Sequence, residues 1–135
     1  MLKIERIDAE LTLPIRHHVL WPKKSIDFCR VPDDANGLHY GVYQENQLVC
    51  VASVFIDGQT ARLRKFATLP EYQGQGMGTA LIKAVIEQLV ANGVTTFWCD
   101  ARESAQGFYH RFGMAPQGER FYKGDVPYFK MSVAL

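Results

Sequence analysis

The chain has 135 residues, which is enough for one domain with its own hydrophobic core. Hydrophobic residues make up 47% of it, charged residues make up 21%, and the net charge is +1, so the composition indicates a globular protein and gives no sign of a nucleic-acid partner. The three cysteines lack metal-site spacing and argue against a disulfide framework. No apolar run approaches the ~20 residues that span a membrane, and the first residues do not form a signal peptide. We therefore expect a cytoplasmic protein without a membrane partner. The cysteine spacing leads us to expect no metal.

The first third of the chain predicts a strand, a helix and an irregular segment. Apolar and charged residues alternate over residues 2–7, which predicts a strand. Residues 9–20 predict a short helix, with Pro14 either in its first turn or breaking it. Clusters of proline, aspartate, asparagine and glycine then predict that residues 21–37 form a loop, or a short helix between loops.

A run of short strands occupies the middle of the chain. Strands are predicted at residues 38–43, 48–56 and 60–69, joined by two short turns, so that the three form an antiparallel meander. A helix is predicted beyond them, because apolar residues between Ala80 and Val90 recur at helical spacing. The dipeptide Asn92-Gly93 then gives a signal for the end of that helix.

The last third predicts another strand, a helix and a hairpin. Residues 94–99 have the apolar, β-branched pattern of a buried strand, and the single preceding helix predicts that this strand pairs in parallel with strand 60–69 through a right-handed crossover. Residues 102–112 predict the last helix, and residues 114–133 predict a hairpin. One face of the last helix is expected to carry the apolar residues Ala105, Phe108 and Phe112.

Between strand 60–69 and the following helix, Gly74, Gly76 and Gly78 stand at alternate positions. The first N–H groups of a helix have no intrahelical partner and carry partial positive charge, and glycines let a phosphate approach the backbone. The stretch therefore predicts a phosphate-binding turn. Its spacing is neither that of a P-loop nor the G-x-G-x-x-G of a dinucleotide site. A tight turn that merely starts the helix is the alternative interpretation.

Two stretches resemble signatures of one family. Residues 73–78, Q-G-Q-G-M-G, resemble the [QR]-x-x-G-x-[GA] signature of the GNAT superfamily of acyl-CoA N-acyltransferases, and residues 105–114 resemble the A-x-x-F-Y-x-x-x-G-F of the same family. The resemblance implies an α/β (α+β) GNAT fold, with a mixed, mostly antiparallel sheet of roughly six to seven strands, splayed central parallel strands and about four flanking helices. It implies that acetyl-CoA is held by Phe66, Ala67, Thr68, Gln73, Gly74, Gln75, Gly76, Met77, Gly78 and Thr79.

The implied reaction is transfer of the acetyl group of acetyl-CoA to a primary amine by direct attack in a ternary complex. Backbone N–H groups at residues 66–68 are the oxyanion donors that the resemblance implies. Tyr109 is our candidate for the general acid. A phenol has a pKa near 10, above the value of about 8.5 for a typical thiol, so it keeps its proton at neutral pH and can hydrogen-bond the departing thiolate. Tyr109 is expected to lie off the apolar helix face. A tyrosine that only packs its ring is the alternative.

The general base is not evident, because strand 60–69 carries arginine and lysine where many members of the family have a carboxylate. Asp100, His39 and an ordered water are the candidates. A non-catalytic acyl-CoA-binding regulatory module is therefore an alternative function, and a nucleotide-binding domain is a third. The sequence does not identify the acceptor, which is a small-molecule or a peptide amine. It also leaves open the length of the acyl group and the oligomeric state, with a homodimer as one possibility.

Overall fold

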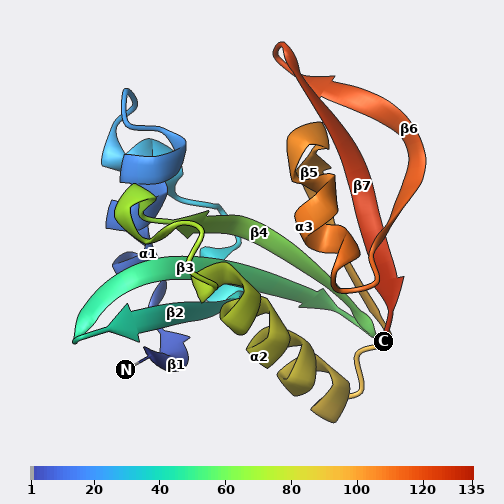
Figure 1. The fold of residues 1–135 in the computed structure, drawn as a ribbon, viewed down its shortest axis with the longest axis horizontal. Helices are drawn as coiled ribbons and strands as arrows, with labels where there is room; N and C mark the ends of the chain where they lie inside the picture. The colour runs from blue at the N-terminus through green and yellow to red at the C-terminus, as the bar shows by residue number, and fades with distance from the viewer. Residues whose placement is uncertain (1) are drawn as a thin grey trace. The chain divides into compact units, whose positions relative to one another are not determined.

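A computed structural model describes residues 2–135 (Figure 1). Over these residues the elements are β1 (Leu2–Ile7), α1 (Ala9–Ile15), β2 (Leu38–Gln44), β3 (Gln47–Asp57), β4 (Thr60–Thr68), α2 (Met77–Ala91), β5 (Thr96–Arg102), α3 (Gln106–His110), β6 (Ala115–Lys123) and β7 (Val126–Ala134). The seven strands follow the order β1-β2-β3-β4-β5-β7-β6. The β4–β5 pair is parallel, whereas β1–β2, β2–β3, β5–β7 and β6–β7 are antiparallel. The predicted mixed, mostly antiparallel sheet is thus confirmed.

The chain divides into two compact units. Unit 1 consists of residues 1–55 and 64–85, and unit 2 consists of residues 56–63 and 86–135. All three boundaries fall inside regular elements, because β3, β4 and α2 each begin in one unit and end in the other. The single domain expected over the whole chain stays a prediction. Among residues 2–135, no helix combines the length and the apolar character that crossing a membrane requires.

One buried cluster of unit 1 lies between α1 and the sheet. In β3, residues 49–54 are all buried, so this strand is covered on both faces. Ile15 of α1 packs with Val51 of β3 and Ala67 of β4 in one buried cluster. Side chains alternate along a strand, so Val51 marks the side of β3 that faces α1. We call this side of the unit 1 sheet the α1 face.

The predicted helix over residues 9–20 is confirmed, but it changes geometry along its length. Pro14 lies well beyond the first turn of α1, and residues 16–20 then adopt π-helical geometry. A proline cannot donate the backbone hydrogen bond of a regular α-helix, and a wider turn after it lets the chain continue helically. Segment 21–37 forms two short 3-10 turns, at Ile26–Cys29 and Asp34–Asn36. Residues 2–135 thus hold three α-helices where about four were expected.

Unit 2 is built on β5, which pairs with β7 from Thr96↔Ala134 to Arg102↔Tyr128. On its other edge, β5 pairs in parallel with the first residues of β4, from Thr60↔Thr96 to Arg62↔Trp98. The strand starts two residues later than predicted, because Val94 still donates its backbone N–H to the carbonyl of Leu89 in α2. The core side of this sheet consists of Ala61, Leu63, Phe97, Cys99, Ala101 and Met131, all of them buried.

Candidate active site

The glycine-rich turn of unit 1 leads directly into α2. Gly74 and Gly76 have φ values of +75° and +85°, a left-handed conformation that side chains disfavour, although a Cβ at either position would meet open space. The first helical hydrogen bond runs from the N–H of Ala80 to the carbonyl of Gly76, at 3.0 Å. The N–H groups of Met77, Gly78 and Thr79 therefore precede the hydrogen-bond ladder of the helix, as in an anion site.

Two exposed glutamine side chains form hydrogen bonds to the backbone around this turn. The Nε2 of Gln73 donates to the carbonyl of Thr68 at 2.9 Å, which ties the turn to the end of β4. The Nε2 of Gln75 donates to the carbonyl of Glu71 at 3.0 Å. Both side chains thus connect the turn to the backbone that precedes it.

The second part of the predicted donor site, residues 66–68, follows an irregularity in β4. Lys65 has φ +54°, an uncommon value for a residue with a side chain, and one that costs on the order of 1 kcal/mol. A left-handed residue breaks the alternation of side chains along a strand. The guanidinium of Arg64 lies 5.9 Å from the ring of Phe55, and the ammonium of Lys65 lies 4.2 Å from the ring of Trp21.

These contacts show which way β4 turns. Phe55 lies four positions after Val51 on β3, and because side chains alternate along a strand, both lie on the α1 face. Ala67 packs on the same face beside Ile15. Arg64 and Lys65 are neighbours in sequence, yet both side chains reach toward the α1 face. The left-handed Lys65 thus changes the orientation of the backbone immediately before the predicted oxyanion donors.

Tyr109 lies in unit 2, on the five-residue helix α3, and is only 8% exposed. Its hydroxyl shares a hydrogen bond with the thiol of Cys99 on β5. Burial raises the pKa of Tyr109 far above its ordinary value, and the neighbouring Cys99 raises it further, so the phenol keeps its proton at any physiological pH. Tyr109 thus has a proton to give, but the same rise in pKa makes its phenol a weaker acid than an ordinary tyrosine.

The predicted orientation of the last helix was wrong. Tyr109 is its buried residue, whereas Phe108 and Phe112 are half-buried and contact each other edge-to-face at 5.2 Å. The regular helix is too short to keep one periodic face over residues 105–112: it starts from a 3-10 turn, and the chain bends after His110. Burial of the ring is therefore part of the role of Tyr109, whatever its hydroxyl does.

Neither side chain predicted as a base is free. The ring of His39 is buried, with Nδ1 2.7 Å from the Oγ of Ser53 and Nε2 2.8 Å from the carbonyl of Asp34. The carboxylate of Asp100 accepts a hydrogen bond from Arg62 at 3.0 Å and lies 3.7 Å from the ammonium of Lys123. The ring of His39, with both nitrogens engaged, would have to give up a contact before it could take a proton from an amine, whereas both contacts of Asp100 involve one oxygen, Oδ2.

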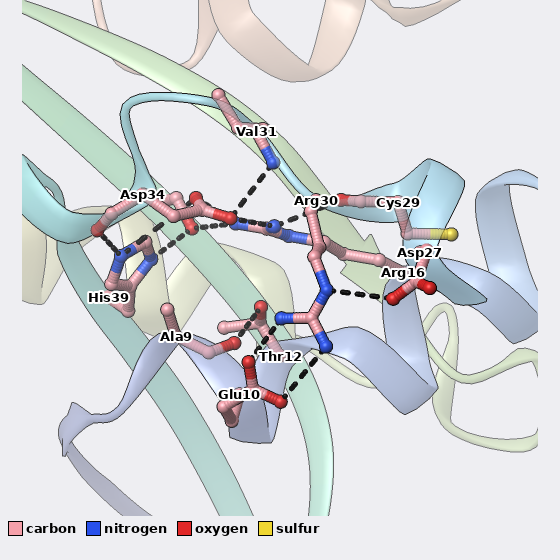
Figure 2. A network of polar contacts seen from close by, with 11 residues as sticks. Ala9, Glu10, Thr12, Arg16, Asp27, Cys29, Arg30, Val31, Asp34 and His39 are labelled. Carbon is pink, nitrogen blue, oxygen red and sulfur yellow. Dashed lines mark hydrogen bonds and ion pairs between the residues drawn. The ribbon is translucent and has the colours of Figure 1, made fainter.

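The sequence interpretation missed a buried ion pair in unit 1 (Figure 2). The side chain of Arg16 is fully buried, and its two terminal nitrogens donate to the carboxylate of Asp34 at 2.8 and 3.0 Å. The guanidinium also donates to the carbonyl of Cys29 at 3.1 Å and to the Oγ of Ser53 at 2.9 Å. A signal existed in the sequence, because Arg16 follows Leu13 by three residues on the apolar side of the helix.

The predicted site residues are divided between the two units. Residues 66–68 and 73–79 belong to unit 1, as does His39, and Tyr109 and Asp100 belong to unit 2. Within unit 1, the hydrogen bond from Gln73 to Thr68 joins the two predicted donor-binding stretches.

Comparisons with known proteins agree with the two sequence signatures. A family model described as an acetyltransferase (GNAT) domain matches residues 29–135. "Uncharacterized N-acetyltransferase YitI" of Bacillus subtilis is 36% identical over 136 residues, which cover 94% of this chain and 89% of that protein. The solved ribosomal-protein-S18-alanine N-acetyltransferase of Escherichia coli has the same fold, with a TM-score of 0.84, 22% identity, and coverage of 99% of this chain and 94% of that one. A GNAT family acetyltransferase of Elizabethkingia anophelis, solved with acetyl-CoA bound, superposes with a TM-score of 0.77 at 17% identity, over 99% and 98% of the two chains.

Proposed function

The chain belongs to the GNAT acetyltransferase family, and on this premise we propose that it transfers the acetyl group of acetyl-CoA to a primary amine by direct attack in a ternary complex. The observation that carries the proposal is the glycine turn. Two glycines at positive φ lead into α2, whose first N–H groups lie outside the helical hydrogen-bond ladder. Such a helix start suits the pyrophosphate of coenzyme A.

The proposed reaction makes one bond and breaks one. The amine nitrogen attacks the thioester carbonyl, the carbonyl oxygen becomes an oxyanion, and the carbon–sulfur bond then breaks to release the thiolate of coenzyme A. Backbone N–H groups at residues 66–68, which follow the left-handed Lys65, are the proposed oxyanion donors. Tyr109 is the proposed general acid, which gives its proton to the thiolate.

The amine must also lose a proton. Because His39 and Asp100 are both engaged in contacts with the protein, we assign this step to water rather than to a side chain. The same observation favours the second candidate function, an acyl-CoA-binding regulatory module without turnover. The two functions make different predictions for amine-dependent release of coenzyme A.

The first experiment measures the melting temperature with saturating acetyl-CoA, with ATP and NAD as control ligands. A ligand at 100 times its Kd adds about 2.7 kcal/mol to the free energy of unfolding, which raises the melting temperature of a domain of this size by several degrees. A rise with acetyl-CoA alone supports the proposed donor. A melting temperature that rises with ATP or NAD instead, or that rises with none of the three ligands, would refute both the acetyltransferase and the acyl-CoA-binding module.

The second experiment follows release of free coenzyme A from acetyl-CoA in the presence of primary amines. We expect Tyr109→Phe to lower kcat by about 10²-fold or more without changing the Kd for acetyl-CoA, as expected for loss of a general acid. The matched control is Tyr122→Phe, which alters a tyrosine that is 60% exposed on β6. Donor binding without release for any amine would favour the regulatory module. An unchanged kcat in Tyr109→Phe would remove the tyrosine from the mechanism.

A further inference from the structure

A cavity of about 310 Å³ lies in unit 1, between α1 and residues 30–35. We call it the α1 cavity. Its walls are formed by Ala9, Glu10, Leu13, Arg30, Val31, Asp34 and Ala35, five of which are labelled in Figure 2. The residues proposed to bind acetyl-CoA or to act in the reaction are not among these seven. An engineered apolar cavity of about 150 Å³ in another protein holds benzene, so the α1 cavity has room for a ring with a short side arm.

The walls of the α1 cavity are mainly aliphatic, because four of the seven lining residues are alanine, leucine or valine. Leu13 and Val31 are only 3% and 5% exposed, so they form a fixed inner surface. The N–H of Val31 also donates to the carboxylate of Asp34 at 2.9 Å, which fixes the backbone at that wall. An apolar ligand gains free energy when it leaves water for such a surface.

The buried Arg16 makes the α1 cavity a pre-formed one. It directly follows α1, and its guanidinium donates to the carbonyl of Cys29, to the carboxylate of Asp34 and to the Oγ of Ser53 on β3. These bonds hold residues 29–34 against the helix and the sheet. A ligand therefore meets walls that are already in place, and its binding does not have to order the chain.

The charges around the α1 cavity favour a cation. Arg30 donates to Asp27 at 3.0 Å and forms an ion pair with Glu10, so its positive charge is matched by two carboxylates (Figure 2). The two segments that enclose the cavity, residues 8–16 and 27–35, contain two arginines and five acidic residues, Asp8, Glu10, Asp27, Asp33 and Asp34. They carry a net charge of −3 in a chain whose net charge is +1. The local field thus attracts a positive charge and repels an anion.

From the aliphatic walls and the surrounding charge we infer that the α1 cavity binds a small amine that has one ammonium group and an apolar body. The apolar body lies against Leu13 and Val31, and the ammonium group lies on the side of Glu10 and Asp34. Polyamines bind less well, because their additional charges would have to leave water beside aliphatic walls. The inference goes beyond the proposed function, since this site needs neither acetyl-CoA nor turnover.

The test is a titration of the ¹⁵N-labelled protein with small ligands, followed by NMR in the absence of acetyl-CoA. Benzylamine, benzyl alcohol and benzoate have similar shapes and differ in charge, and spermidine is a polyamine without a ring. We expect benzylamine to bind with a Kd on the order of 1 mM, a value suited to a ligand of about eight heavy atoms. Benzyl alcohol should bind at least fivefold more weakly, and benzoate more weakly still. The shifted amide signals should be those of residues 9–13 and 30–35, with Val31 among them.

Two variants test the cavity walls separately. Ala35→Leu adds side-chain atoms at the cavity and should weaken benzylamine binding by roughly tenfold, whereas Asn36→Leu, in the same 3-10 turn but outside the lining, should leave it unchanged. Glu10→Gln should lower the preference for benzylamine over benzyl alcohol several-fold. Its matched control is Glu87→Gln, at an exposed glutamate of α2. A retained spectrum of the folded protein shows that each variant is intact.

The outcomes leave the inference and the proposed function separable. Benzyl alcohol, benzoate or spermidine binding as tightly as benzylamine would overturn the inference, as would no binding of benzylamine up to about 20 mM. Benzylamine binding that is unchanged in both Ala35→Leu and Glu10→Gln, or that shifts only signals outside residues 9–13 and 30–35, would also overturn it. These results would leave the acetyltransferase standing, because no titration contains acetyl-CoA. Failure to bind acetyl-CoA would refute the proposed function and leave the α1 cavity as an amine site.

Discussion

Replacing Asp34 with alanine should destabilise the protein severely, because the change isolates a buried positive charge. The side chain of Arg16 is 0% exposed and that of Asp34 is 14% exposed. In Asp34→Ala the guanidinium keeps its hydrogen bonds to the carbonyl of Cys29 and to the Oγ of Ser53, but it loses its counter-charge. Breaking a buried pair from one side typically costs about 3–5 kcal/mol.

The magnitude is large compared with the whole stability of a small domain, which is about 5–15 kcal/mol. A variant that removes both charges behaves differently. In the double variant Arg16→Met with Asp34→Ala, no ion remains to be desolvated, and methionine fills much of the volume of the arginine stem. We therefore expect the double variant to be more stable than Asp34→Ala alone, which is a strongly non-additive result.

Urea denaturation monitored by tryptophan fluorescence and by circular dichroism measures the free energy of unfolding of the wild type, both single variants and the double variant. Coincident transitions from the two probes would justify a two-state treatment. A cost below about 1 kcal/mol for Asp34→Ala would refute the reasoning, since that is the range of an exposed ion pair. So would a double variant whose cost equals the sum of the two single costs.

Three further predictions follow from the geometry. Burial alone would raise the pKa of the Asp34 carboxyl, but the hydrogen bonds that this carboxylate accepts lower its pKa below the usual value. The stability that Asp34 contributes is therefore present above the unfolded pKa of about 3.9 and is lost as the pH falls through the folded pKa. Between pH 5 and pH 2 the urea midpoint should fall more for the wild type than for Asp34→Asn, and equal falls would contradict this prediction. Gly76→Ala should weaken acetyl-CoA binding by roughly fivefold, because alanine lets the free turn relax out of the left-handed conformation and binding must then restore it at about 1 kcal/mol. Gly58→Ala, at φ +62° in a hairpin turn with open space around it, should carry similar strain and leave the Kd unchanged in calorimetry. All three cysteines are buried, and burial raises the thiol pKa to about 11 for Cys50 and about 12 for Cys99. An aromatic disulfide reagent at pH 8 should therefore react slowly with the native protein and fully with the protein in guanidinium chloride. A thiol that reacts fast in the native state would contradict this packing.

Local sequence patterns predicted most of the architecture. Alternating apolar and polar residues, flanked by turn residues, indicate strands. The observed β1 to β4 accordingly begin and end within a residue or two of the predicted bounds. The glycine turn was predictable because glycine is the residue that a positive φ favours, and Gly74 and Gly76 have that conformation. In both cases the information lies within a few neighbouring residues.

Features that depend on distant partners were not predictable in the same way. Lys65 adopts a glycine-like φ with no glycine to signal it, because contacts in the folded chain impose the conformation. Arg16 is buried only because Asp34, eighteen residues later, neutralises it. The burial of Tyr109 depends on Cys99 of a neighbouring strand and on the shortness of α3. Helical periodicity describes none of these contacts.

The sharing of β3, β4 and α2 between the two compact units has a consequence for how the protein can come apart. Separate domains are usually joined by linkers, which can be cut or exchanged without damage to either part. Here the boundaries fall after Phe55 and after Leu63 inside strands, and after Val85 inside a helix. A fragment cut at any of these boundaries would keep unpaired backbone groups from part of a strand or part of a helix. A cut at such a position therefore breaks backbone hydrogen bonds within one regular element, which makes a stable half-protein an unexpected product of proteolysis.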